Sequence, residues 1–498
     1  MLLRHVMAAL ALILPVATAT AAPPQAAPYS ENPHYLAMDG VPVFPLGATH
    51  AHSWTPISRP QVDLLQDLDR LAAMVQRIGS RHVRGFVRCM PYDPLNHLHD
   101  GDVQRTLQPW KRLDDGRFDL EDFEPEWEQR LRAFLDAAAE RRILVSLELW
   151  DDWSVTRGVG GAWDPGEGAA WNGHPFNPDN NVNYGRDALT HTTRACVAPF
   201  YETIGDDNAA VLRLQQLYAE HLIAIAAEYP TVIFNLSNET RAPLSWSRYW
   251  AEYLRERLPE GRMIGDMPST NRRDGRGECD PELNPLTLAV DGRYDFVDIA
   301  QGVSRHEFGA DPVRQAVGGG ERIRSYRAAM QEEGRVKPLV VSKEYTRSRD
   351  GGTIVLWSRF TGGAAAARFH RPGRNQRGVS DFQYQAIEHL GRFVAGVPFW
   401  TMQPDPDVLV RQPADLDGAL VLARRGKRYV VQLMGGAADG KLAVQLEPGP
   451  YQARWFDPEN GTYLDADSEF TAGRDPHTLR LPSNGGHVIL HISRRNGD

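Results

Sequence analysis

Apolar runs that resemble β-strands alternate with amphipathic helical segments between about residues 41 and 405. The strand-like runs are VPVFPLGATHAHSW, RHVRGFVRCM, RILVSLELWDDW, TVIFNLSNET, RMIGDMPST, YDFVDIAQGVS, KPLVVSKEYT and GGAAAARFH. They lack a strict alternation of polar and apolar residues, which is typical of parallel strands buried on both faces. Eight such strands, with helices or long loops between them, predict an α/β protein with a (β/α)8 or TIM barrel. A doubly wound sheet is the rival fold, but no G-x-G-x-x-G follows the first strand.

The character of the sequence changes after Asp405-Pro406. Short strand-like runs follow, separated by Gly, Pro and Asn: ALVLARRGKRYVVQL, KLAVQLEPGPYQARWF and HVILHI. EPGP and ENGT are typical of the turns in β-hairpins. We therefore expect the barrel over residues 41–405 and a small antiparallel β-sandwich domain over residues 406–498. The simplest role for this second domain is to support the barrel.

The first residues have the pattern of a secretory signal peptide. Arg4 and His5 precede an apolar run over residues 6–16, and small residues then occupy alternate positions. The apolar run is too short to cross a bilayer as a mature helix. We expect residues 1–21 to be removed on export and residues 22–40 to form a lead-in segment. The protein is then secreted or periplasmic, and no membrane association is expected.

The charge balance, 55 Lys+Arg against 64 Asp+Glu, gives a net charge of −9. Nucleic acid is not an expected partner, because phosphate contacts need a basic surface. The sequence contains no C-x-x-C or H-E-x-x-H motif, so neither a metal nor another cofactor is expected. Cys89, Cys196 and Cys279 allow either a bridge, such as Cys196 to Cys279, or free thiols. The sequence does not indicate an oligomeric state.

Two glutamates end predicted barrel strands. Glu239 ends the fourth strand, in IFNLSNET, and Glu344 ends the seventh, in LVVSKEYT. Active sites of (β/α)8 barrels lie at the carboxyl ends of the strands, so these two side chains are expected to face each other across the barrel mouth. Two carboxyl groups placed in this way can cleave a glycosidic bond. Either glutamate alone could instead be an ordinary solvated loop residue, and the joint pattern is what favours a catalytic pair.

These motifs resemble those of the clan A retaining glycoside hydrolases, which have an Asn-Glu acid/base after strand four and a Glu nucleophile after strand seven. The resemblance covers most of the predicted barrel and implies a carbohydrate substrate. It implies that Glu239 is the acid/base, that Glu344 is the nucleophile, and that Asn238 holds the sugar 2-hydroxyl. Retention of configuration would place the two carboxyl groups about 5–5.5 Å apart. Other members often have an Arg after strand two and a Tyr or His after strand six, for which the candidates are Arg84, Arg88 and His306.

Other side chains near the predicted mouth are candidates for substrate binding. The segment over residues 151–205 is long and rich in Gly, Asn and Trp, so we expect it to cover the substrate. Trp150 and Trp357 are candidates to stack on a sugar ring, with packing in the core as the alternative for each. The remaining candidates are Glu148, Tyr345, His50 and His52.

A weaker and narrower resemblance is to the apiosidase-like glycoside hydrolases, in which a small β-domain follows the barrel. It rests on DGVPVFPLGATHAHSW, GGAAAARFH and FVAGVPFWTMQPDPDVL. The first strand departs from that family, because THAHSW stands where the family usually has an Asp-Thr-Ala-Trp pattern. The specificity of that family is therefore not carried over to this chain.

Two other functions are compatible with the same fold. His50 and His52 lie at positions i and i+2 of the first strand, so they point the same way and could share a metal, as in metal-dependent amidohydrolases. That ligand set is incomplete, because strand five has no His and strand six has only His306. A non-catalytic glycan-binding barrel is the second alternative, and the presence of both glutamates argues against it.

Overall fold

The computed structural model describes most of the chain after residue 24. The described ranges are 25–48, 57–58, 63–92, 107–156, 170–189, 199–204, 208–269, 280–345, 349–371, 381–436, 440–464, 468–482 and 486–495. The predicted signal peptide, His50 and His52 lie outside these ranges.

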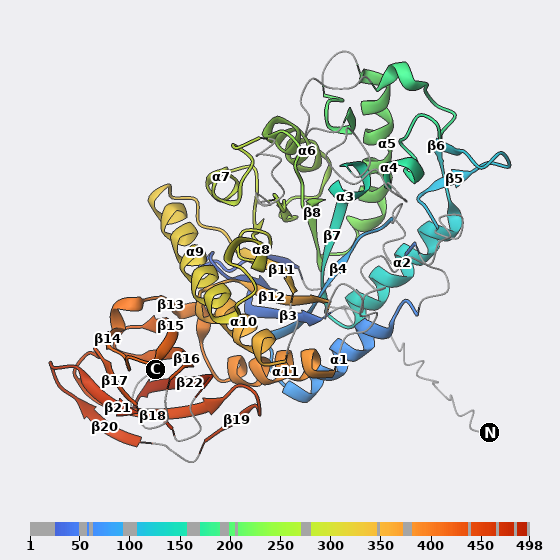
Figure 1. The fold of residues 1–498 in the computed structure, drawn as a ribbon. Helices are drawn as coiled ribbons and strands as arrows, with labels where there is room; N and C mark the ends of the chain where they lie inside the picture. Colours follow the sequence, from blue (N-terminus) through green and yellow to red (C-terminus); the bar gives the residue numbers. More distant parts are fainter. Residues whose placement is uncertain are drawn as a thin grey trace, which may run out of the picture.

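Each of the eight predicted runs contains one strand of a parallel sheet, which confirms the barrel (Figure 1). The strands are β3 (Val41–Ala48), β4 (Val83–Cys89), β7 (Leu144–Asp151), β8 (Val232–Asn238), β9 (Ile264–Gly265), β10 (Val297–Asp298), β11 (Leu339–Tyr345) and β12 (Ala366–Arg371). Their order in the sheet is β10-β11-β12-β3-β4-β7-β8-β9. Two backbone hydrogen bonds join its ends, from Asp295 N–H to Ile264 O (2.7 Å) and from Asp298 N–H to Asp266 O (3.1 Å). The sheet is therefore a nearly closed barrel.

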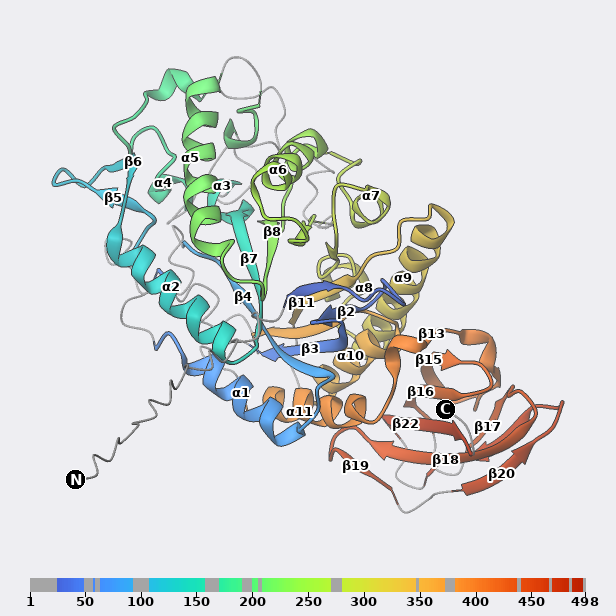
Figure 2. The same ribbon diagram turned by 180° about the vertical axis from the view of Figure 1, so that it is seen from behind.

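Helices cover the outside of the barrel (Figures 1 and 2). The longer ones are α1 (Gln66–Ile78), α2 (Pro125–Glu140), α5 (Ala209–Ala226), α6 (Leu244–Arg257), α7 (Pro285–Val290), α9 (Pro312–Glu332), α10 (Arg349–Thr361) and α11 (Asp381–Ala395). The short ones are α3 (Asp152–Thr156), α4 (Ala170–Gly173) and α8 (Arg305–Phe308).

Helix α2 illustrates how the sequence produces this outer layer. The Glu124 side chain accepts a hydrogen bond from the N–H of Glu126, and Pro125 occupies the first helical turn, where a missing N–H costs nothing. Trp127 and Leu131 recur at a spacing of four residues and are buried against the barrel. The apolar face therefore fixes how the helix lies on the strands.

Helix α10 was not expected from the sequence, because RDGGTIVLWSRFT contains two glycines and a β-branched run. Its residues from Gly351 to Thr361 are nearly all buried, between the barrel and the second domain. Tertiary packing therefore outweighs the low helical propensity of this segment.

The lead-in segment forms part of the fold. Strands β1 (Ala26–Pro28) and β2 (Leu36–Met38) pair antiparallel, and β2 continues onto the amino-terminal half of β3. A separate hairpin, β5 (Trp110–Arg112) with β6 (Phe118–Phe123), lies between β4 and α2 in the chain. The amino-terminal end of the barrel is thus covered by β1 and β2.

The C-terminal residues form the predicted antiparallel sandwich. One sheet has the order β13-β15-β16-β22-β18-β19, with β20 also on β18, and the other has the order β14-β17-β21. The bounds are β13 (Gln403–Pro404), β14 (Leu409–Arg411), β15 (Leu416–Arg424), β16 (Arg428–Gly435), β17 (Lys441–Val444), β18 (Gly449–Asp457), β19 (Thr462–Tyr463), β20 (Ser468–Ala472), β21 (His477–Arg480) and β22 (Val488–Arg494). A hydrophobic core of its own fills this domain.

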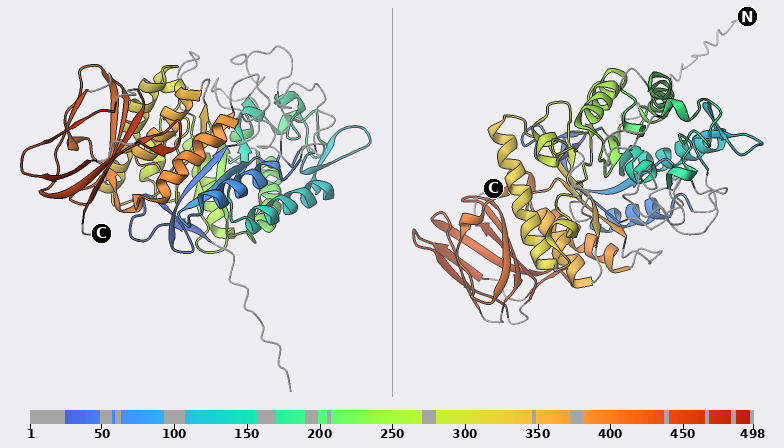
Figure 3. Two further views of the ribbon diagram at one scale, coloured as in Figure 1. Left: turned by 90° about the horizontal axis from the view of Figure 1, so that it is seen from below. Right: turned by 45° about the horizontal axis from the view of Figure 1, so that its top comes forward.

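The sandwich lies against the helices of the last third of the barrel (Figure 3). Thr361 of α10 donates a hydrogen bond from Oγ1 to Gln432 Oε1 of β16 (2.7 Å), and the Leu420 side chain packs against Gly320 of α9. Within the described ranges, no helix combines the length and the apolar character that a membrane span needs.

Candidate active site

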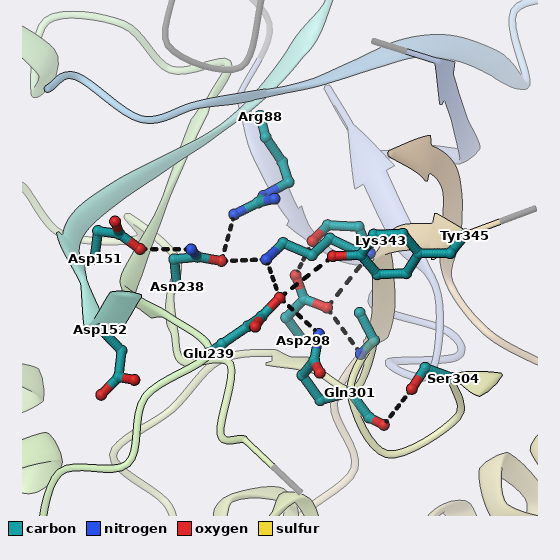
Figure 4. Close-up of polar contacts among 12 residues, drawn as sticks. Arg88, Asp151, Asp152, Asn238, Glu239, Asp298, Gln301, Ser304, Lys343 and Tyr345 are labelled. Carbon is teal, nitrogen blue, oxygen red and sulfur yellow. Dashed lines mark hydrogen bonds and ion pairs between the residues drawn. The ribbon is translucent and has the colours of Figure 1, made fainter. Parts of the chain in front are cut away.

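Glu239 directly follows β8 and has an unusual backbone conformation. Its φ is +56°, in the left-handed region that residues other than glycine rarely adopt. Its side chain is 5% exposed, and Oε1 accepts hydrogen bonds from Gln301 Nε2 (2.9 Å) and from Lys343 Nζ. The hydroxyl of Tyr345 lies 3.5 Å from the same oxygen (Figure 4). Strain of this kind persists only where the surroundings enforce it, and it clusters at functional sites.

Lys343 of β11 is the strand-seven residue that faces Glu239. Its Nζ donates to Glu239 Oε1 and to Asn238 Oδ1, and its side chain is 2% exposed. Burial lowers the pKa of Lys343, while the carboxylate of Glu239 acts in the opposite direction. The sequence pattern alone does not single out this lysine, which directly precedes Glu344 in the run LVVSKEYT.

Glu344 faces the helical layer and not the barrel interior. Its Oε1 accepts a hydrogen bond from Gln315 Nε2 of α9 (2.6 Å), and its Oε2 accepts one from Arg359 Nε of α10 (2.8 Å). Side chains alternate between the two faces of a strand, so Lys343 and Tyr345 reach Glu239 while the residue between them points outward. The prediction that Glu239 and Glu344 face each other across the mouth is therefore wrong in this structure. Burial raises the pKa of Glu344, and Arg359 opposes that shift.

Asn238, the residue before Glu239, is hydrogen-bonded to several buried side chains inside the barrel. Its Oδ1 accepts a hydrogen bond from Arg88 Nη2 of β4 (3.0 Å), and its Nδ2 donates to Asp151 Oδ1 of β7 (2.6 Å). Arg88 also pairs with Glu148, and both are almost completely buried inside the barrel. Three of the predicted substrate-binding residues, Asn238, Arg88 and Glu148, thus belong to one network under the site. Direct contact of any of them with a substrate stays a prediction.

Asp298 at the end of β10 and Gln301 shortly after it also belong to the site, although neither is among the predicted site residues. Asp298 Oδ1 accepts a hydrogen bond from the N–H of Ala300 (3.1 Å), and its Oδ2 accepts one from Ser342 Oγ. Burial raises the pKa of Asp298. Gln301, three residues further along, reaches Glu239. Their signal in the sequence was the strand-six run YDFVDIAQGVS, which contains both residues.

Arg84 lies away from the mouth. It is in the amino-terminal half of β4 and donates from Nη1 to Val83 O (2.8 Å). Burial lowers the pKa of Arg84. Arg142, before β7, lowers this pKa further, and Asp39, before β3, raises it. The prediction that Arg84 binds substrate at the carboxyl end of the barrel is therefore wrong. Arg88, four residues further along β4, is the arginine of this strand that lies inside the barrel.

Trp150 and Trp357 are both core residues, so their predicted roles as sugar platforms are wrong. The Trp150 ring on β7 packs against Phe200 and Trp250, with centroids 5.2 and 5.3 Å apart. The Trp357 ring on α10 packs between Phe393 and Phe456. Each tryptophan is at most 1% exposed, because each side chain points into the layer outside the barrel.

The remaining predicted residues cannot be placed. His50 and His52 lie outside the described ranges, and the side chain of His306 in α8 is likewise undescribed. Cys196 and Cys279 lie outside the described ranges too, while Cys89 is a buried free thiol. In the part of the chain that is described, no group of three or more His, Cys, Asp or Glu side chains comes together as metal ligands would. The metal-dependent alternative through His50 and His52 stays a prediction.

Asp266, just after β9, is a buried acid on the outer side of the barrel wall. It accepts hydrogen bonds from Ser247 Oγ of α6 (2.6 Å) and from the N–H groups of Ser237 (3.1 Å) and Met267 (2.8 Å). Burial raises its pKa to about 7, against the pull of these donors. Its contact with α6 gives it a structural role.

We expect Asp266→Asn to stabilise the fold by on the order of 4 kcal/mol at about pH 8 and by only about 1–2 kcal/mol at about pH 5, because the pKa is raised from 3.8 to about 7 and each unit corresponds to about 1.4 kcal/mol. A raised pKa means that the folded state binds the proton more tightly than the unfolded chain, so wild-type stability falls as the pH rises from about 4 to about 7. Asparagine resembles the protonated acid and removes that loss. Urea unfolding at both pH values measures the effect, with the exposed Asp114→Asn as control. An equal change at both pH values would contradict the assignment.

No family model and no curated protein matches the sequence. Solved structures do match the fold. A glycoside hydrolase has a TM-score of 0.60 and 12% identity, over 95% of this chain and 98% of that one. A glycoside hydrolase family 5 protein from Bacteroides vulgatus ATCC 8482 has a TM-score of 0.59 and 12% identity, over 95% of this chain and 94% of that one. The predicted resemblance to glycoside hydrolases is thus confirmed for the fold, whereas the narrower apiosidase-like resemblance is not confirmed.

Proposed function

We propose that this chain hydrolyses glycosidic bonds of a carbohydrate at the carboxyl end of the barrel, with Glu239 exchanging protons with the reactants. The observation that carries the proposal is the buried Glu239 carboxylate, which Lys343 and Gln301 hold inside the barrel although its backbone is strained. Glycosidic cleavage uses carboxyl groups next to the reacting bond, and Glu239 supplies one at the end of the barrel where active sites lie. The likeness in fold to solved glycoside hydrolases supports the proposal.

Hydrolysis of a glycosidic bond moves two protons. The leaving oxygen gains one, and the attacking water loses one. A carboxyl group can perform either transfer if it is fixed within hydrogen-bond reach of the reacting oxygen. The amide of Gln301 fixes the orientation of Glu239 by donating to Oε1, and Tyr345 approaches the same oxygen from β11.

The double-displacement form of the reaction also needs a nucleophile, for which the sequence motif offers Glu344. That role requires the carboxylate to leave Gln315 and Arg359 and to reach the opposite face of β11. The proposal of hydrolysis therefore rests on Glu239, and retention of configuration is a separate hypothesis.

The test compares sugar release from a panel of plant and bacterial polysaccharides by the wild type, Glu239→Gln and Glu260→Gln. Glu260 is an exposed glutamate in the loop after α6 and serves as the matched control. We expect release by the wild type and the control, and a loss of at least about 100-fold for Glu239→Gln, because proton transfer by one positioned group contributes this much.

Equal release by Glu239→Gln and the wild type would overturn the proposal. If the wild type binds a glycan without turnover, the glycan-binding barrel is the better description. Zinc at stoichiometric amounts in the purified protein, together with hydrolysis that survives Glu239→Gln, would favour the metal-dependent alternative.

A further inference from the structure

The ammonium group of Lys343 lies between two oxygens of the site. Its Nζ donates to Asn238 Oδ1 and to Glu239 Oε1, and Figure 4 shows the three side chains converging from β8 and β11. The lysine is 2% exposed and the glutamate 5%. The two charges therefore meet in a place that water hardly reaches.

A buried pair of this kind is a poor device for stability alone. Removing both charges from water costs several kcal/mol per ion, and their attraction recovers this only when the geometry is good. An apolar pair of similar volume often does as well or better. Direct contact does, however, favour the charged form of each partner over its neutral form. The main effect of the pair is thus to favour the ionised form of Glu239.

We infer that Lys343 is a positioning residue that keeps Glu239 ionised in the resting site, so that Glu239 starts the reaction as a proton acceptor. This inference rests on the proposed function and adds the order of the proton transfers to it. A general acid must carry its proton before the substrate arrives, whereas a base must be free of it. The proton that Glu239 takes from the attacking water then balances the one that the leaving oxygen gains.

Other charged and titratable groups surround the pair at one contact further out. Tyr345 reaches Glu239 from β11, and its ring lies near Arg305 of α8 (5.6 Å) and His370 of β12 (5.0 Å). The groups that act from the remaining strands include Arg88 on β4, Glu148 and Asp151 on β7, Asp298 on β10 and Arg368 on β12. The acids among them oppose ionisation of Glu239 and the three arginines favour it. Lys343 differs from these charged groups because its ammonium group donates a hydrogen bond directly to Glu239.

The inference is tested by the pH dependence of kcat/KM, measured on the polysaccharide that the wild type cleaves, for the wild type, Lys343→Met and Lys343→Arg. Loss of the cation makes ionisation of Glu239 harder, so the acidic limb of the Lys343→Met profile should move to higher pH by about one to two units. Lys343→Arg retains the charge and should keep the acidic limb close to that of the wild type. A purely structural lysine would lower the rate at every pH without moving the limb.

A second measurement follows Glu239 without any activity. Infrared difference spectra between the wild type and Glu239→Gln, recorded through a pH titration, give the protonation of this one carboxyl group. The same pair of spectra in the Lys343→Met background should show its midpoint displaced upward. If Lys343→Met does not fold, Lys343→Gln replaces it in both measurements.

The two measurements separate the possible failures. Absence of sugar release together with an infrared midpoint that depends on Lys343 would sink the proposed function and keep only the part of the inference that Lys343 holds Glu239 in its ionised form. An unmoved acidic limb and an unmoved midpoint in a folded Lys343→Met protein would overturn the inference and leave hydrolysis by Glu239 standing.

Discussion

Replacement of Glu344 by glutamine is expected to destabilise the protein by about 3–5 kcal/mol, because it breaks a buried ion pair and leaves a cation without its counter-charge. The Arg359 side chain is 0% exposed, and its Nε and Nη2 atoms both lie 2.8 Å from Glu344 Oε2. The glutamine would also place its amide group against the donors of Arg359 or Gln315. Any loss of activity in Glu344→Gln is therefore expected to come from loss of folded protein.

The contribution of the pair is measured by urea unfolding of Glu344→Gln, Arg359→Met and the double variant. Arg359 Nη2 has one further acceptor, Val303 O at 2.8 Å, which cannot neutralise its charge. Each single variant is thus expected to lose several kcal/mol, and the double variant less than their sum, because it leaves no unpaired charge. Arg359 is the matched partner, since it touches Glu344 without being a candidate nucleophile.

A further variant, Glu344→Ala, decides whether Glu344 is a nucleophile. A nucleophile exchanged for alanine leaves a space in the site that azide can fill, and azide then restores turnover by attacking the anomeric carbon. We expect no restoration in Glu344→Ala, because its carboxylate lies on the outer face of β11. A stable but inactive Glu344→Gln, with turnover restored by azide in Glu344→Ala, would contradict this orientation and support the retaining mechanism.

The two glutamates illustrate what an apolar run in a sequence can and cannot predict. Both were expected at the ends of strands four and seven, and both lie there, because the length of the buried run determines where a strand ends. The face on which a side chain points depends on register, and a shift of one residue exchanges the two faces of a strand. In β11 the pairing with β12 shifts on both sides of Glu344, and an irregularity of this kind has no signal in one sequence.

The tryptophans illustrate a second limit. A position at a strand end or in a loop favours a place near the substrate, but Trp150 points into the layer outside the barrel and Trp357 lies in a helix. Large aromatic side chains supply buried area equally well in a core and under a sugar ring. Composition therefore does not distinguish these roles, and only the arrangement of the surrounding elements does.

Trp357→Ala is expected to destabilise the protein by about 3–5 kcal/mol without a change in KM for the substrate. The ring is 0% exposed, and its centroid lies 5.1 Å from that of Phe393 in α11 and 5.5 Å from that of Phe456 in β18. It thus fills the junction between the barrel helices and the sandwich, and its removal leaves a large cavity there.

The cavity effect is measured as the shift in Tm by calorimetry, with KM determined on the folded protein at a temperature well below the transition. Trp400→Ala is the control, because this tryptophan is only partly buried, where it stacks on His82 with centroids 4.4 Å apart. It should lower Tm by less, since fewer contacts and less buried area are lost. A Trp357→Ala protein with unchanged Tm and a raised KM would instead place this ring under the sugar, and would mean that α10 moves when substrate binds.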